Sequence, residues 1–81
     1  MSASVKSEIE TFVINKVREK REEQNISQSE LATHLEVSNG FIGQAESPNY
    51  PTKYNLNHLN KLALILKCSV KDFMPDKPFN K

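Results

Sequence analysis

The fold is decided by the stretch SQSELATHLEVSNGFIGQAES, residues 27–47. It opens with Ser27 and, three residues later, Glu30, the capping-box pattern in which two side chains satisfy backbone N–H groups at a helix start. Apolar residues then follow at helical spacing and predict a helix that ends near residues 36–37. Ser38 is placed to cap a second short helix over residues 39–46, which Pro48 stops. Two short helices joined by about three residues describe a helix-turn-helix.

Helices are also predicted on both sides of this motif. Upstream, a helix with an apolar stripe ends in a run of mixed charges at residues 18–23. Its stripe is made of Val5, Ile9, Phe12, Val13 and Val17, with Ile14 off it. Downstream, Asn55 caps a fourth helix with one apolar face. That face is made of Leu56, Leu59, Leu62, Ala63 and Leu66.

A short fifth helix is predicted between Ser69 and Pro75. Its buried residues are expected to be Val70, Phe73 and Met74. The sequence therefore predicts an all-α fold of five helices with a central helix-turn-helix. One domain is expected over residues 5–74, followed by a short and loose C-terminal tail over residues 75–81.

Composition limits the classes of protein. The chain has 81 residues, a net charge of +1 and one cysteine, so we expect one domain without an internal disulfide. Residues 1–6 lack the apolar run of a signal peptide, and no segment is apolar enough to cross a membrane, which favours a cytoplasmic protein. The spacing of His34, His58 and Cys68 matches no zinc pattern. No catalytic constellation is present, so we expect no enzyme, metal or cofactor.

The motif resembles the lambda-repressor-like (XRE/Cro-CI type) helix-turn-helix family. The similarity rests on residues 27–32, on Val37-Ser38, and on Ile42 and Glu46, and it extends from about residue 13 to residue 74. It implies a five-helix domain that docks its third helix in the major groove of double-stranded DNA, usually as a homodimer. It further implies that Gln28 contacts a phosphate and that Arg21 pairs with Glu46. The implied base-reading positions are Asn39, Gly40 and Gln44.

A helical projection of residues 39–46 predicts which side chains face outward. At about 100° per residue, the outward face holds two amides and two glycines. These residues are Asn39, Gly40, Gly43 and Gln44. Amides pair bidentately with adenine, so the projection predicts a site that leans to A·T pairs, with Phe41 near a thymine methyl.

The neighbouring loop supplies further candidate contacts to DNA. Lys53 is the leading phosphate contact in the motif region, and Ser38 and Asn55 lie at helix starts, where N–H groups attract phosphates. Tyr54 is expected either to contact phosphate or to pack over the third and fourth helices, whereas packing is favoured for Tyr50.

Two observations favour a rival function. Residues 27–55 carry one lysine against three glutamates, which is a weak electrostatic attraction for DNA. Glu36 and Lys67 stand where the family often has glycine, so Glu36 is either strained at positive φ or in a reshaped turn. The rival is the same fold used as a protein-interaction module, as in an antitoxin or a phage-type switch. No small-molecule effector is evident in the sequence.

Overall fold

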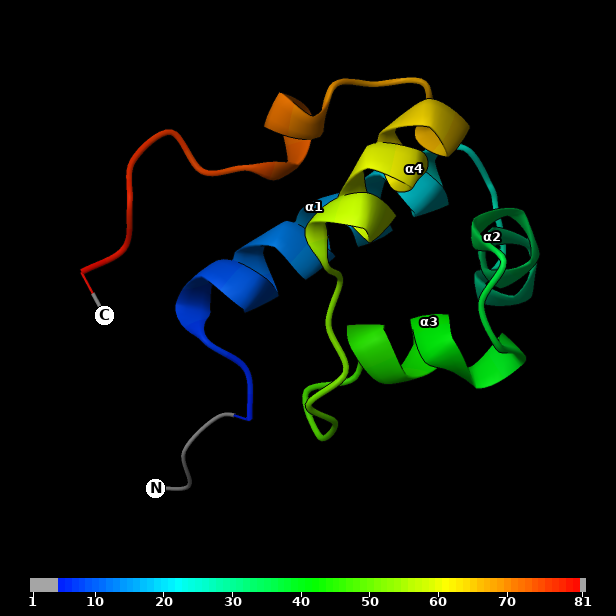
Figure 1. Ribbon diagram of the computed structural model, residues 1–81, viewed down its shortest axis with the longest axis horizontal. Coiled ribbons are helices and arrows are strands. Elements are labelled where there is room, and N and C mark those ends of the chain that lie inside the picture. Colours follow the sequence, from blue (N-terminus) through cyan, green and yellow to red (C-terminus); the bar gives the residue numbers. More distant parts are fainter. Residues whose placement is uncertain (1–4, 81) are drawn as a thin grey trace.

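The computed structural model describes residues 5–80, which form four α-helices and one 3-10 helix without a β-strand (Figure 1). Residues 1–4 and 81 lie outside the described residues. Most of the segment used for the signal-peptide prediction and the last residue of the predicted tail fall there. The elements are α1 (Glu8–Glu23), α2 (Gln28–Leu35), α3 (Asn39–Glu46), α4 (Leu56–Leu66) and the 3-10 helix η1 (Val70–Phe73). The all-α class is confirmed.

The fifth element differs from the prediction, because η1 is a single 3-10 turn of four residues and not an α-helix. Ser69 caps it, and Asp72 completes a capping box. The turn ends at once because Pro75 disfavours helical backbone at the preceding residue, and short segments of this kind adopt 3-10 geometry. Met74 is accordingly extended and 38% exposed, so its predicted burial was wrong.

Capping side chains explain where most helices begin. α1 starts after Ser7, whose side chain forms a reciprocal capping box with Glu10, so Val5 lies before the helix and is exposed. α2 begins at the predicted box of Ser27 and Glu30. Ser38 has the backbone of a cap for α3, but its side chain makes no capping hydrogen bond. The start of α3 is therefore the least tightly fixed of the α-helix starts.

The core lies between the four α-helices, with Ile42 contributed by α3, and it is closed by Phe73 from η1. Its largest fully buried side chains are Val17, Leu31, Ile42, Leu62, Leu66 and Phe73. Ile14, expected off the buried stripe, is in fact buried because the end of α3 and the following Pro48 cover that side of α1. Leu56 is 79% exposed, so its place on the buried face of α4 was wrong.

Three helix ends use left-handed backbone at residues other than glycine. Asn25, Glu36 and Lys67 have φ angles of 57°, 64° and 59°. The left-handed turn is thus retained after α2, and it places a β-carbon where glycine is favoured. The Glu36 carboxylate pairs with Lys61, and this contact connects the strained turn after α2 to α4.

The segment after η1 is anchored at one point. Figure 1 shows it at the end of the long axis opposite to α2. The Phe79 ring packs edge-on against Phe12 of α1, with 6.0 Å between ring centroids. The predicted loose tail is therefore docked through this contact. None of the helices in residues 5–80 has the length and apolarity that a bilayer crossing needs.

Candidate nucleic-acid interface

α3 presents a narrow polar face to solvent. Asn39, Gly40 and Gln44 are exposed and Gly43 is half-buried. On the opposite side, Ile42 and Ala45 are buried in the core. The helical projection is confirmed, because burial divides the eight residues of α3 as the 100° spacing predicts.

The C-terminal end of α3 is held by a buried ion pair. Arg21 Nε donates to Glu46 Oε2 at 2.8 Å and Arg21 Nη2 donates to Glu46 Oε1 at 2.9 Å, which is a bidentate contact. The third nitrogen, Nη1, donates to the carbonyl of Ile26 at 2.8 Å. Both charged side chains are almost fully shielded from water, with exposed fractions of 9% and 2%. The ion pair that the resemblance implied is present, and it raises the pKa of Arg21.

A second cation holds the same end of α3. Lys6 is buried and donates to the carbonyl of Gln44 at 3.3 Å and to the carbonyl of Ser47. The Gln44 carbonyl also accepts from the Ser47 backbone N–H, so Lys6 adds a second donor there, and its charge opposes the negative end of the helix dipole. Burial lowers the pKa of Lys6, while the nearby Glu10 carboxylate raises it.

Gln28, the implied phosphate contact, lies across α3. Its Nε2 donates to Glu46 Oε1 at 2.9 Å. A β-carbon added at Gly43 would lie 3.2 Å from Gln28 Oε1, which is closer than most such contacts. Gly43 therefore leaves room for the Gln28 side chain. The second hydrogen of Gln28 Nε2 is left for a phosphate.

The two outward amides of α3 have hydroxyl neighbours. Thr52 Oγ1 in the following loop donates to Gln44 Oε1 at 3.2 Å. Ser29 Oγ on α2 approaches Asn39 Oδ1 at 3.4 Å, which is a weak contact. A β-carbon added at Gly40 would be in ordinary van der Waals contact with Gln44 Nε2, at 3.9 Å. The structure thus brings Asn39, Gly40 and Gln44 onto one accessible face.

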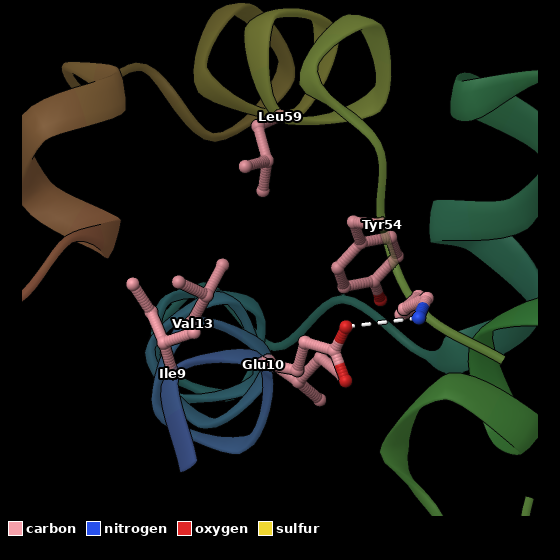
Figure 2. A pocket seen from close by; sticks show the side chains of 7 residues that line it. Ile9, Glu10, Val13, Tyr54 and Leu59 are labelled. Atoms are coloured by element: carbon pink, nitrogen blue, oxygen red, sulfur yellow. Dashed lines mark ion pairs between the residues drawn. The ribbon is translucent and has the colours of Figure 1, made fainter. Parts of the chain in front are cut away.

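The loop residues are arranged differently from the prediction. Figure 2 shows the ion pair of Lys53 with Glu10 of α1, and their Nζ–Oε2 distance is 2.9 Å. Lys53 therefore lies toward α1 rather than free beside α3. The pair borders a small pocket of about 90 Å³, which is lined by Ile9, Glu10, Val13, Ile14, Lys53, Tyr54 and Leu59.

Of the two tyrosines, Tyr54 is the one that packs. Its ring lies 6.1 Å from Phe41 and 6.2 Å from His58 between centroids, and its buried hydroxyl has no hydrogen-bond partner among the described residues. Burial raises the pKa of Tyr54, and the nearby Glu46 carboxylate adds to the rise. Phe41 faces this aromatic cluster rather than the open side of α3. Tyr50 is exposed, so the packing favoured for it was wrong.

Asn55 has a structural role at the start of α4. Its Oδ1 accepts from the His58 backbone N–H at 2.7 Å, and His58 Nδ1 accepts from the Asn55 backbone N–H at 3.1 Å. The Asn55 side chain is therefore occupied by the cap rather than presented to a ligand.

Three contacts at this site were not anticipated from the sequence. Lys6 reaches α3 across 38 positions, Thr52 orients Gln44, and Glu10 holds Lys53. The Ser7–Glu10 capping box is readable in the sequence and signals the start of α1. No local pattern signals the three long-range contacts, since each depends on how the helices pack.

The possible metal ligands of the sequence are not brought together. Within residues 5–80 no group of three histidine, cysteine or acidic side chains is placed to hold a metal ion. Cys68 is half-buried beside the core, and burial raises the pKa of its thiol. It packs as a small apolar side chain.

The family described as "Cro/C1-type HTH DNA-binding domain" matches residues 16–78. The chain belongs to this Cro/C1-type helix-turn-helix family. A comparison with the curated proteins found no match.

Solved structures share the fold. The restriction-modification controller protein C.AhdI from Aeromonas hydrophila is similar with a TM-score of 0.68 and 22% identity, covering 79% of this chain and 94% of that chain. Hydroxypropylphosphonic acid epoxidase from S. wedmorenis is similar with a TM-score of 0.74 and 18% identity, covering 89% of this chain and 37% of that chain. This chain thus spans well under half of the length of the epoxidase. At these identities the likeness shows the fold alone.

Proposed function

We propose that this Cro/C1-type domain is a sequence-specific transcriptional regulator that binds double-stranded DNA as a homodimer with α3 in the major groove. It acts in the cytoplasm by occupying its site, without catalysis, a cofactor or a small-molecule effector. The observation that carries the proposal is the accessible face of Asn39, Gly40 and Gln44 on a helix whose far end is fixed by the Arg21–Glu46 pair. A helix that is fixed at its C-terminal end and carries outward amides suits base readout.

Direct readout rests on Asn39 and Gln44, because the glycines between them have no side chain. Bidentate pairing with adenine uses both amide atoms of Gln44, and Oε1 has a second lone pair, so Gln44 can keep the Thr52 hydroxyl while it accepts from a base. A good bidentate base contact discriminates by about 1–3 kcal/mol. We therefore expect a short half-site that leans to A·T pairs.

The two expected phosphate contacts differ in what they require. Lys53 is 58% exposed in its pair with Glu10, so it can turn to a phosphate at little cost. Gln28 donates one Nε2 hydrogen to the nearly buried Glu46 and has a second one for a phosphate. With so few free cations near α3, we expect weak non-specific binding and a shallow salt dependence.

The rival function, a protein-interaction module, is favoured by one specific observation. Gln28 and Lys53, two of the expected phosphate contacts, are both bonded to carboxylates of this same chain. A surface that satisfies its own polar groups suits a protein partner as well as DNA.

Selection of binding sites from a random duplex library separates the two functions. We expect an enriched A·T-leaning sequence, and fluorescence anisotropy should show tighter binding to it than to random duplex. Gln44→Ala should flatten the preference at one base position, whereas Asn15→Ala, an exposed amide on α1, should leave it unchanged. If no sequence is enriched, or if Asn39→Ala and Gln44→Ala bind DNA as the wild-type chain does, the result would contradict the proposal and favour the protein-interaction module.

A further inference from the structure

The Gln44 amide is held at one end on the outward face of α3. Its Oε1 accepts from the Thr52 hydroxyl at 3.2 Å. At the other end of the amide, Nε2 lies over the preceding turn of α3, 3.9 Å from the position that a β-carbon would take at Gly40. The amide group therefore extends from the loop after α3 to Gly40, and the hydroxyl of Thr52 holds its loop side.

The loop that carries Thr52 is itself held in place. Pro51, directly before it, has a fixed backbone angle φ. Directly after it, Lys53 pairs with Glu10 of α1 at 2.9 Å, and the Tyr54 ring packs in the aromatic cluster between α3 and α4. Thr52 is half-buried and β-branched, so its side chain has few accessible rotamers. The hydroxyl that meets Gln44 is therefore fixed relative to α3.

An amide that turns freely can make a hydrogen bond with each of the four bases in the major groove. Nε2 alone can donate to guanine O6 or N7 and to thymine O4, and Oε1 alone can accept from cytosine N4. Adenine alone offers a donor beside an acceptor, at N6 and N7, so only adenine matches both ends of an amide held in one plane. Holding the amide therefore makes a contact that would tolerate several bases selective for one.

The Thr52 hydroxyl leaves both ends of the Gln44 amide able to read a base. Oε1 keeps one lone pair, and Nε2 keeps both of its hydrogens. A reversed amide would donate from Nε2 to the same hydroxyl, and a donor and an acceptor would again lie side by side. The contact is exposed in the free protein. A docked duplex excludes water from it, which strengthens the hydrogen bond in the complex.

We propose that Thr52 is a positioning residue that determines specificity and acts on DNA only through the Gln44 amide. This inference rests on the proposed DNA-binding function and adds the residue that makes its base readout selective. Asn39 provides an internal comparison, because its hydroxyl neighbour Ser29 lies at 3.4 Å and makes a weaker contact. The base read by Gln44 is therefore selected more strictly than the base read by Asn39.

Substitution of Thr52 tests the proposal on the sequence that the wild-type chain selects. The position read by Gln44 is the one at which Gln44→Ala loses its preference, and fluorescence anisotropy compares duplexes with each of the four base pairs there. Thr52→Val keeps the branched shape but lacks the hydroxyl. The preference at this position should fall by about two- to tenfold, the factor that one neutral hydrogen bond supplies. Thr52→Ser retains the hydroxyl and should retain most of the preference.

Three further measurements separate positioning from other roles of Thr52. Thr11→Val, at an exposed threonine of α1, should leave every base preference unchanged. In a Gln44→Ala background, Thr52→Val should cause no further change, because no amide is left to hold. A further loss in that background would show that Thr52 contacts DNA itself and would overturn the proposal. Circular dichroism should show all variants folded, since none of the three positions belongs to the buried core.

Failure of this inference is distinct from failure of the proposed function. If the wild-type chain selects a sequence but Thr52→Val keeps every base preference, the positioning role is overturned and DNA binding stands. The same holds if Gln44→Ala keeps every preference. If the wild-type chain selects no sequence, the proposed function fails, and the positioning role that rests on it is overturned as well.

Discussion

The buried ion pair between α1 and α3 and two of the ion pairs on the surface use similar chemistry in opposite surroundings. Arg21 and Glu46 are 9% and 2% exposed and meet through two hydrogen bonds. Lys53–Glu10 and Lys61–Glu36 are single contacts in which at least one side chain is more than half exposed. Removing one partner of a shielded pair lowers the free energy of unfolding strongly, because the other charge stays buried without a partner. At an exposed pair, water and salt ions take the place of the missing partner. The buried pair is therefore a structural tie, and the exposed pairs are free to exchange.

The largest effect should follow from Arg21→Ala. The variant leaves the Glu46 carboxylate in the interior with Gln28 as its nearest hydrogen-bond donor. Removing one partner of a buried pair costs about 3–5 kcal/mol, a large share of the stability of a small domain. Urea unfolding should show a much lower midpoint. The control is Arg18→Ala, which removes a half-exposed arginine whose Nε lies 3.9 Å from Glu46 Oε1. An equal loss of stability in this control would contradict the contrast between buried and exposed pairs.

Replacing both partners should restore part of that loss. Arg21→Met with Glu46→Leu leaves no isolated charge in the interior, and such apolar replacements are often close to neutral. The coupling energy in a double-mutant cycle should be at least about 1 kcal/mol. Gln28 loses its acceptor in the double variant, so full recovery is not expected. A double variant as unstable as the sum of its single variants would show that each residue acts alone.

Substitutions in the turn after α2 should have a smaller effect on stability, and here glycine should be more stable than alanine. Glu36→Gly and Glu36→Ala both remove the exposed pair with Lys61, but only glycine relieves the left-handed backbone at φ 64°. Glu36→Gly should therefore be more stable than Glu36→Ala by about 1 kcal/mol, despite the greater freedom of glycine in the unfolded chain. Thermal or urea melts compare the two directly. If alanine is the more stable, the turn carries no strain.

The smallest effect on stability is expected for Lys53→Ala. Its pair with Glu10 is exposed, so the free energy of unfolding should change by about 0–1 kcal/mol. The same variant should weaken binding to every DNA sequence alike and lower the salt slope by about one. Glu10→Gln is the matched control, because it frees Lys53 and should strengthen binding slightly. A Lys53→Ala variant with unaltered DNA affinity would confine Lys53 to its contact with α1.

The sequence predicted what is local and missed what depends on packing. The capping box at Ser27 and the 100° spacing of α3 lie within a few residues, so helix ends and the outward face of α3 were readable. The 3-10 turn of η1 was missed because helical spacing over four residues does not distinguish the two kinds of helix.

The candidate site was predictable only in outline. The Arg21–Glu46 pair was implied by family resemblance, not by spacing along the chain. Lys53 was expected at a phosphate because nothing near it in sequence reveals Glu10, which lies 43 positions away. The sequence left two alternatives for Tyr54, a phosphate contact or packing against the helices. Its burial depends on Phe41 and His58, which belong to two different helices.

The two ends of α3 differ in how firmly they are held, and this has a dynamic consequence. Arg21 and Lys6 fix the C-terminal end, whereas Ser38 makes no capping hydrogen bond at the start. We therefore expect the thermal motion of α3 to increase from its C-terminal end toward Asn39. Amide exchange should be faster in its first turn than in its last. A base read by Gln44 would then meet a stationary side chain, while one read by Asn39 would meet an adaptable one, so a half-site would be strict at one edge and tolerant at the other.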